Sequence, residues 1–311
     1  MATTRTLTAE QAGPITVDAE LLGLGGIVTV RTQSTIKNAE ITIRTADDSG
    51  ALADAVRAAA LQWDPRGSLV ARVQGKGSGG NGFSQTVITG GRGRRVTQVV
   101  SGNSGSTVIM SGGNISVDNG TVIVNGHVIS GSANTVIIGG SSVEIEAVLP
   151  EGSSVIGRTD SADVAADGTF TAIAGTTQSG DIRVQGTSEQ VTAQTQSGDV
   201  TIGNAPNIVV KTQSGDVGLG RTDVVEAHTM SGDITIKDFG GTAKLKTMSG
   251  DIDVHATAGG DIDASTMSGD IEVTATQAAL DDALDVRPHT MSGRIRVPHR
   301  QNSSSGPRRR R

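Results

Sequence analysis

The sequence has no cysteine and no tyrosine, and its 311 residues include only one tryptophan and three phenylalanines. The absence of cysteine excludes disulfide bonds and thiolate metal sites. Because ring volume is scarce, stacked Val, Ile, Leu, Ala and Thr side chains must fill the interior. The formal charge of −6 argues against a dedicated nucleic-acid-binding protein, which is usually basic.

Long hydrophobic runs are also missing. No apolar stretch approaches the roughly 18 residues that a membrane span requires. Glu10, Pro14, Asp18 and Glu20 interrupt the first 30 residues, so no signal-peptide core is visible there. We therefore predict a cytoplasmic protein without a membrane span.

The residue patterns of common enzyme sites are absent as well. The five histidines, at no metal-ligand spacing, are His127, His228, His255, His289 and His299. No glycine-rich string ends in the Gly-Lys-Ser/Thr of a phosphate loop, and no serine lies in a G-x-S-x-G turn. We predict a protein that is not an enzyme and has no cofactor, metal or catalytic residue. A carbohydrate-active enzyme is the weaker alternative, because carboxylates are plentiful but aromatic faces for sugars are few.

A short turn sequence is repeated along the second half of the chain. From Ser179 to Ser268 the tripeptide Ser-Gly-Asp recurs every 17 to 19 residues, and Ser-Gly-Arg follows at Ser292. A unit this short is stable only against its neighbours. We therefore predict a mainly β protein, a single-stranded β-solenoid (β-helix) of coils about 18 residues long. The predicted turn residues are Ser179, Gly180, Asp181, Ser197, Gly198, Asp199, Ser214, Gly215, Asp216, Ser231, Gly232, Asp233, Ser249, Gly250, Asp251, Ser268, Gly269 and Asp270.

Each repeat also predicts the direction of its side chains. The third and fifth residues after each serine are apolar, as in Ile182 and Val184, so one strand per coil points two side chains inward. Glycine permits the turn, and aspartate can accept hydrogen bonds from turn amides. Aspartates stacked about 4.8 Å apart would repel one another. We interpret each carboxylate as the cap of its own turn, in preference to a column of bound cations.

A second column precedes the serines and changes its chemistry partway. It consists of Gln178, Gln196, Gln213, Met230, Met248, Met267 and Met291. Stacked glutamines can form amide ladders, and stacked methionines form a soft apolar stripe. An inward position at a corner of the coil, as part of the core, is the interpretation we favour. If the column faces outward, its four methionines are a candidate interaction surface for a partner or for self-association.

Changes in periodicity divide the chain. We predict a small α/β N-terminal domain over residues 1–74, with a helix near residues 50–62 rich in alanine and leucine. Glycine, serine and arginine dominate residues 75–106, which predicts a flexible segment. The solenoid should cover residues 107–298, and residues 299–311 should form a disordered basic tail. Arg308, Arg309, Arg310 and Arg311 are only a weak indication of nucleic acid or anionic lipid.

One segment resembles a known family. The run Leu149-Pro150-Glu151-Gly152, followed by Thr159-Asp160-Ser161-Ala162-Asp163 and the TQSGDI and TMSGDI units, is similar to the bacterial putative-adhesin β-strand-repeat proteins, a domain-of-unknown-function family frequent in actinobacteria. The similarity covers about residues 100–297. It implies a β-solenoid with no demonstrated catalytic residues, sometimes surface-exposed or linked to envelope stress. We therefore expect a structural or interaction module that binds an unidentified protein or cell-envelope partner through a rigid face, with a self-assembling scaffold as the alternative.

Overall fold

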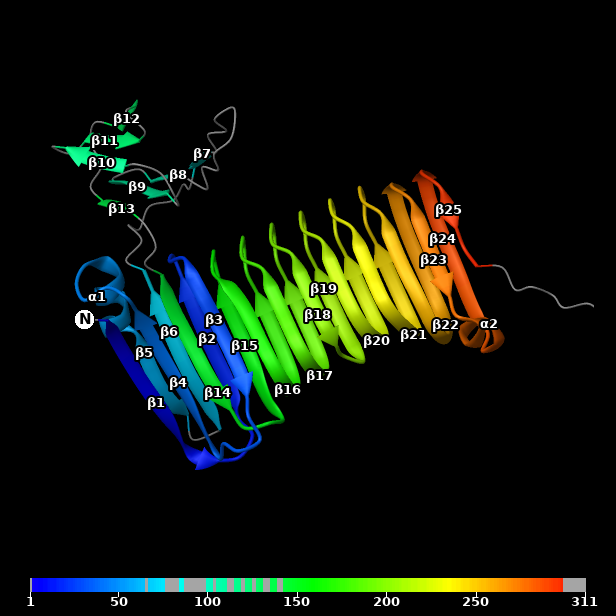
Figure 1. Cartoon of the computed structure of the whole chain (residues 1–311), viewed down its shortest axis with the longest axis horizontal. Coiled ribbons are helices and arrows are strands. Elements are labelled where there is room, and N and C mark those ends of the chain that lie inside the picture. The colour runs from blue at the N-terminus through cyan, green and yellow to red at the C-terminus, as the bar shows by residue number, and fades with distance from the viewer. Residues whose placement is uncertain are drawn as a thin grey trace, which may run out of the picture.

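The computed structural model describes residues 2–64, 67–75 and 142–298 in full, and between residues 84 and 138 it gives the backbone of seven short strands. In these parts the protein is mainly β, as predicted, with a main sheet of 18 strands, two small sheets of three and four strands, and two helices. Figure 1 shows the strands of this sheet stacked side by side along one long axis.

Residues 2–75 supply the first strands of the sheet. They are β1 (Thr3–Ala12), β2 (Thr16–Leu22), β3 (Gly26–Thr32), β4 (Asn38–Thr45), β5 (Ala60–Asp64) and β6 (Ser68–Gln74), with helix α1 (Ala51–Ala58) between β4 and β5. β1 pairs with β4 and β5 with β6 in antiparallel register, whereas β2 runs parallel to β6. Alternating residues give these strands one buried side, as in β4, where Ile41 and Ile43 are fully buried.

The first helix is shorter than the sequence predicted. α1 ends at Ala58, because Ala59 takes an extended backbone conformation and residues 60–64 pair with β6. The helix buries one side, which includes Leu52 and Val56, against the sheet. Alanine and leucine favour a helix locally, but strand pairing at residue 60 decides where it stops.

Strands far apart in the sequence join the two halves of the protein. β14 (Val143–Leu149) lies between β3 and β4, β15 (Ser153–Thr159) pairs with β2, and β16 (Asp163–Thr176) pairs with β3 and β15. The buried apolar side chains of both halves form one continuous cluster. The N-terminal strands and the repeats therefore share one sheet and one core.

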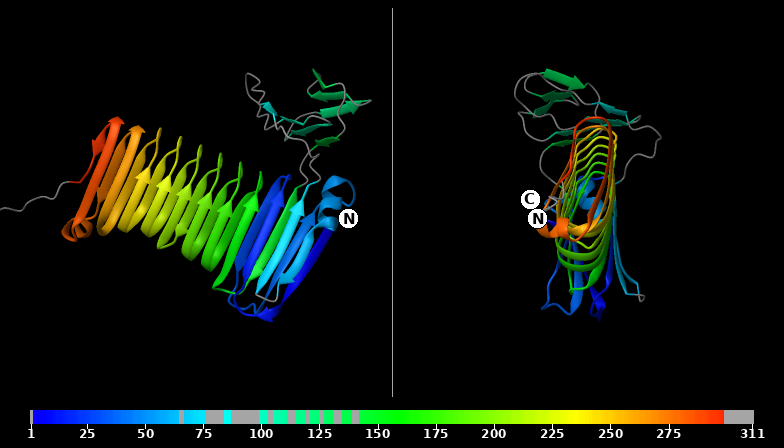
Figure 2. Two further views of the ribbon diagram at one scale, coloured as in Figure 1. Left: turned by 180° about the vertical axis from the view of Figure 1, so that it is seen from behind. Right: turned by 90° about the vertical axis from the view of Figure 1, so that its right-hand side faces the viewer.

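The remaining strands come from the repeats. They are β17 (Ile182–Gln194), β18 (Val200–Asn204), β19 (Asn207–Lys211), β20 (Val217–His228), β21 (Ile234–Lys246), β22 (Ile252–Ser268), β23 (Ile271–Ala275), β24 (Leu284–Ser292) and β25 (Ile295–Arg296), with helix α2 (Gln277–Asp281) between β23 and β24. Each coil pairs in parallel with the next, so equivalent residues form columns. Seen down the long axis, the coils superpose around a narrow, flattened section (Figure 2).

The inward side chains follow the predicted alternation. The apolar pair after each turn is buried in every described coil from Ile182 and Val184 to Ile271 and Val273. In the last coil Ile295 is 44% exposed, because no further described strand covers it. The interior is therefore a row of aliphatic pairs that grows by one pair per coil.

The corner opposite the repeated turns has its own inner column. Phe170 and Phe239 are its two large members and are both buried. In the sheet register Phe239 faces Thr222 of the preceding coil and Ala256 of the following coil. A large side chain between two small ones lets adjacent layers interlock.

Helix α2 explains why the last repeat is longer. Ser268 and Ser292 lie in register although 24 residues separate them in the sequence. The additional residues form α2, whose first turn is capped by Thr276, since its Oγ1 accepts the Ala279 N–H at 3.2 Å. This helix was not predicted.

Several predicted segments lie mostly outside the described residues. The structure gives strands β7 (Ser84–Thr86) and β8 (Val99–Gly102) within the segment predicted to be flexible, residues 75–106. From the start of the predicted solenoid it gives β9 (Gly105–Met110), β10 (Ile115–Asp118), β11 (Thr121–Val124), β12 (His127–Ser130) and β13 (Thr135–Ile138). The tail of residues 299–311, with its four terminal arginines, lies outside the described residues.

Candidate functional site

The repeated turns stack directly on one another. From Ser197 to Ser268 the backbone N–H of each turn serine donates to the carbonyl of the glutamine or methionine in the preceding coil, as from Ser197 to Gln178 at 2.9 Å. The same bond runs from Ser249 to Met230 at 2.9 Å and from Ser268 to Met248 at 3.0 Å. The turn residues are therefore part of the sheet's hydrogen bonding and continue it around the corner.

Glycine is required in these turns for close approach between coils. A Cβ at Gly198 would lie 1.9 Å from the Gly180 carbonyl oxygen, and a Cβ at Gly215 would lie 1.9 Å from that of Gly198. Backbone atoms held in a sheet cannot move aside for it. The backbone freedom of glycine suits the turn, as the sequence predicts, but the narrow space between coils restricts the choice of residue more strictly.

Buried threonines support the same turns from inside. Thr177 Oγ1 accepts the Gly180 N–H at 2.9 Å, and Thr195 Oγ1 accepts the Gly198 N–H at 3.0 Å. Thr195 Oγ1 in turn donates to the Gly180 carbonyl at 3.5 Å. In these two turns the cap is thus threonine, whereas the buried Oγ1 atoms of Thr212 and Thr229 have no hydrogen-bond partner.

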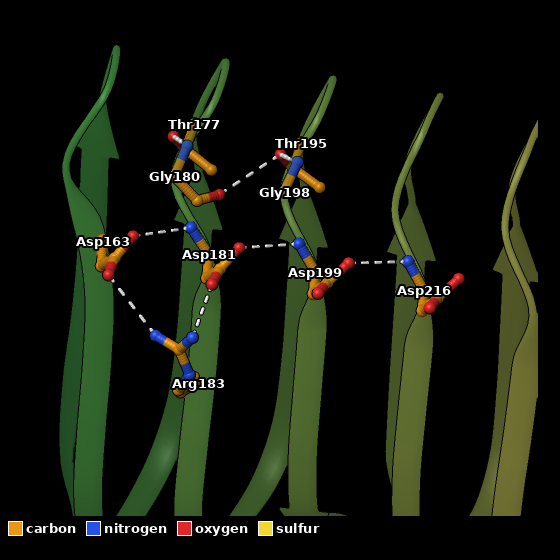
Figure 3. Close-up of polar contacts among 9 residues, drawn as sticks. All are labelled: Asp163, Thr177, Gly180, Asp181, Arg183, Thr195, Gly198, Asp199 and Asp216. Carbon is orange, nitrogen blue, oxygen red and sulfur yellow. Dashed lines mark hydrogen bonds and ion pairs between the residues drawn. The ribbon is translucent and has the colours of Figure 1, made fainter. Parts of the chain in front are cut away.

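The aspartates form a ladder between coils, which corrects the prediction that each carboxylate caps its own turn. Asp181 Oδ1 accepts the backbone N–H of Asp199 at 2.9 Å, and Asp199 Oδ1 accepts that of Asp216 at 3.0 Å (Figure 3). The same bond joins every aspartate from Asp163 to Asp270 to the next coil. A charge-assisted hydrogen bond to each carboxylate offsets the repulsion within the column.

Arginines lie at both ends of the aspartate ladder. Arg183 bridges Asp163 at 3.4 Å and Asp181 at 2.5 Å (Figure 3). At the other end the Arg294 backbone N–H donates to Asp270 Oδ1 at 2.8 Å, and its guanidinium contacts Oδ2 at 2.8 Å. These contacts, the backbone bond first, hold the pKa of Asp270 below its usual range.

The column before the serines points outward, contrary to the inward position that the sequence analysis favoured. All three glutamines are exposed, and the exposed fractions are 50% for Met230, 48% for Met248, 49% for Met267 and 74% for Met291. The reason is local: Thr229 points inward, and the turn then interrupts the alternation, so that Met230 and Ser231 both face out. We call these seven outward side chains the corner column.

A groove of about 480 Å³ runs beside the glutamine half of the corner column. It crosses several coils and is lined by Gln178, Gln196 and Gln213 together with Arg158 and Lys211. The groove therefore presents a row of amides, with the charged side chains of Arg158, Lys211 and Asp160 beside it. Sequence reasoning missed it, although the repeated glutamine was the signal that could have located it.

The strands before the turns carry a group of basic residues near the centre of the stack. Lys211, His228 and Lys246 occupy one row of the register, and Glu226 faces Lys244. His228 Nε2 lies 3.0 Å from Glu226 Oε1. This hydrogen bond, with smaller contributions from Lys244 and Lys211, holds the pKa of Glu226 below its usual range.

The strands after the turns carry acidic residues towards the end of the stack. Burial raises the pKa of Asp253 above its ordinary value of 3.8, and the charges of Glu272, Asp251 and Asp233 raise it further. The ionised carboxylate of Asp253 is therefore less favourable in the folded chain than in the unfolded chain.

We predict that Asp253→Asn stabilises the fold at neutral pH. Because the pKa of Asp253 is raised by folding, its ionised carboxylate lowers the free energy of unfolding. This loss of stability is fully present above the folded-state pKa and absent below the ordinary pKa. The gain should therefore shrink as the pH falls through the pKa of Asp253. Urea unfolding at pH 7 and near pH 3 measures it, with the charge-retaining Asp253→Glu as control. A gain of the same size at both pH values would contradict the prediction.

The described parts of the chain contain no cluster of three or more His, Cys, Asp or Glu side chains arranged to hold a metal ion. In the same parts, no helix is long and apolar enough to cross a membrane. His228 and His255 each contact a neighbouring polar side chain, Glu226 and Thr274 respectively.

Comparison with known proteins places these features in a family. The Toastrack DUF4097 family matches residues 84–310. A crystal structure of a putative lipid binding protein from Parabacteroides distasonis is similar at 12% identity and a TM-score of 0.51, covering 95% of this chain and 97% of its own. A putative adhesin from Bacteroides fragilis, also 12% identical, has a TM-score of 0.43 and coverages of 96% and 97%. No curated protein matches the sequence significantly.

Proposed function

The chain belongs to the Toastrack DUF4097 family, and from that premise we propose that it is a non-enzymatic interaction module. In this proposal the coils form a β-solenoid of about 18 residues per turn, which holds the corner column in a fixed row for a protein partner. The observation that carries the proposal is the outward position of all seven side chains of the column. Large unbranched side chains held at regular intervals on a rigid edge suit recognition of an extended partner.

The stiffness of the column supports this role. Serine N–H bonds and the aspartate ladder join each turn to the next, and threonine caps the turns at Gly180 and Gly198, so the backbone beneath the column has little freedom. A rigid surface loses little conformational entropy when a partner binds. The groove beside Gln178, Gln196 and Gln213 supplies hydrogen-bonding groups at the same edge.

The alternative is self-assembly, in which the partner is a second copy of the chain. The structure supports this alternative less well than binding of a different protein. In each coil the turn threonine donates its N–H forward, as from Thr247 to the Ser265 carbonyl at 3.0 Å. Because every second backbone group of a strand points to the same side, Thr290 and Pro288 face the edge that no described strand covers. Proline has no N–H to offer there, and proline on an edge strand limits edge-to-edge pairing.

Site-specific crosslinking tests the proposed surface. A photo-reactive amino acid is placed in the full-length chain at Gln196, at Met248 or at Thr201, which is also exposed but lies on a strand after the turn. We expect crosslinked protein adducts from Gln196 and Met248 and few from Thr201. An excess of the same protein without the photo-reactive amino acid should reduce these adducts. Equal labelling from all three positions would reject the corner column as the binding surface.

A further inference from the structure

The four methionines of the corner column are the only methionines in residues 2–64, 67–75 and 142–298, and each is about half exposed or more. Methionine is among the residues most often buried in proteins. In the described residues, the other large hydrophobic side chains that are exposed are Val224 and Ile295. The thioethers are therefore concentrated on one outer edge.

The backbone fixes these methionines next to one another. The Ser249 N–H donates to the Met230 carbonyl at 2.9 Å, and the Ser268 N–H donates to the Met248 carbonyl at 3.0 Å. Ser268 and Ser292 are in register, which places Met291 beside Met267. Neighbouring methionines are thus one strand apart, about 4.8 Å at the backbone. An unbranched side chain with three rotatable bonds allows adjacent sulfur atoms to converge.

Convergent thioethers are ligands for a soft cation. Thioether sulfur selects Cu(I) over harder divalent ions, and imidazole also suits copper. His228 and His289 each lie two residues before an outward methionine, Met230 and Met291, on the same outer side of the strand. Nitrogen donors therefore lie beside both ends of the methionine row.

The charges around the row have both signs. Asp233 and Asp251 are exposed three residues after Met230 and Met248, on the far side of the turn. Lys246 precedes Met248 on the near side. A monovalent cation meets less repulsion from this lysine than a divalent cation would.

We propose that the methionine half of the corner column is a Cu(I) site, in which neighbouring thioethers share the ion and His228 or His289 can complete its coordination. The site needs no change of backbone, because the sheet already holds the ligands in adjacent coils. It does not depend on the protein partner proposed above: the two share the column, but the ion needs only the sulfur atoms and no partner.

An anaerobic competition titration tests the site. The full-length protein and a chromophoric Cu(I) chelator compete for Cu(I) in the presence of ascorbate. Replacing all four column methionines by leucine keeps the apolar stripe but removes the sulfur. We expect this variant to bind Cu(I) at least about tenfold more weakly. Gln196→Leu is the matched control at an equivalent position without sulfur and should bind as the unchanged protein does.

Two results would overturn the proposal. The first is equal Cu(I) affinity in the protein with four leucines. The second is an affinity that falls with His228→Gln and His289→Gln but not with loss of the methionines. Should the leucine variant aggregate, the same four positions are changed to glutamine, which the chain already carries at Gln178, Gln196 and Gln213. Circular dichroism confirms that each variant is folded, and crosslinking from Gln196 reports on the protein partner separately.

Discussion

Gly215→Ala strongly destabilises the stack of coils, as we expect from the contact between turns. The new Cβ would lie 1.9 Å from the Gly198 carbonyl oxygen, so the two coils must separate. Separation weakens the bond from the Ser214 N–H to Gln196 and the bond from the Asp216 N–H to Asp199. Overpacking combined with two weakened hydrogen bonds should cost about 3 to 5 kcal/mol of unfolding free energy.

Gly218→Ala is the matched control for this substitution. Gly218 lies three residues further along the same coil, and a Cβ there would meet nothing within 4 Å. Alanine at such a position has little effect or stabilises by about 0.4 to 1 kcal/mol, because it restricts the unfolded chain. Urea unfolding followed by circular dichroism measures both variants. Similar midpoints for the two would mean that coil spacing is not what requires Gly215.

Phe239→Ala should have the second large effect. The ring is completely buried, and its neighbours in the inner column of the opposite corner are Thr222 and Ala256, which are too small to fill the space left behind. Removing a buried aromatic side chain in this way costs about 3 to 5 kcal/mol. Because each coil depends on its neighbours, amide exchange should accelerate most in β20, β21 and β22.

Phe239→Leu tests whether the loss of stability comes from the lost side-chain volume or from any change of residue at this position. Leucine fills most of the space and should recover more than half of the lost stability, as volume-conserving changes usually cost less than about 1.5 kcal/mol. Urea midpoints of the two variants provide the comparison. If leucine and alanine lower the midpoint equally, the cavity is not the cause of the loss.

The sequence predicted the strands of the repeats well because their signal is local. The alternation around Ile182 and Val184 depends only on which side of a strand is buried, and burial confirms it. The sequence indicated that the aspartate carboxylates accept hydrogen bonds, but not which backbone N–H groups donate them. Every coil from Asp163 to Asp270 has an aspartate equivalent to Asp199. A carboxylate that accepts an N–H from its own turn and one that accepts an N–H from the next coil therefore produce the same sequence pattern.

Other features depend on contacts that the periodicity of the sequence does not indicate. Whether Met230 points in or out is decided by the turn, where two successive residues leave the alternation. The pairing of β2 with β15 joins residues more than 130 positions apart, as Thr16 and Ser154 show. The groove arises only when Gln178, Gln196 and Gln213 are stacked beside Arg158 and Lys211. Each of these needs the coils to be assembled first.

The aspartate ladder has a consequence for the length of the protein. Every bond in it joins one coil only to the next and points in the same direction, from Asp163 to Arg294. A coil could therefore be added or removed as a cassette, for example by joining Ser214 directly to Gly232, and the new neighbours would find the same partners. The distance between the two ends of the stack is then adjustable in increments of one strand spacing, about 4.8 Å. The length of the stack is thus set by the number of times one turn sequence is copied.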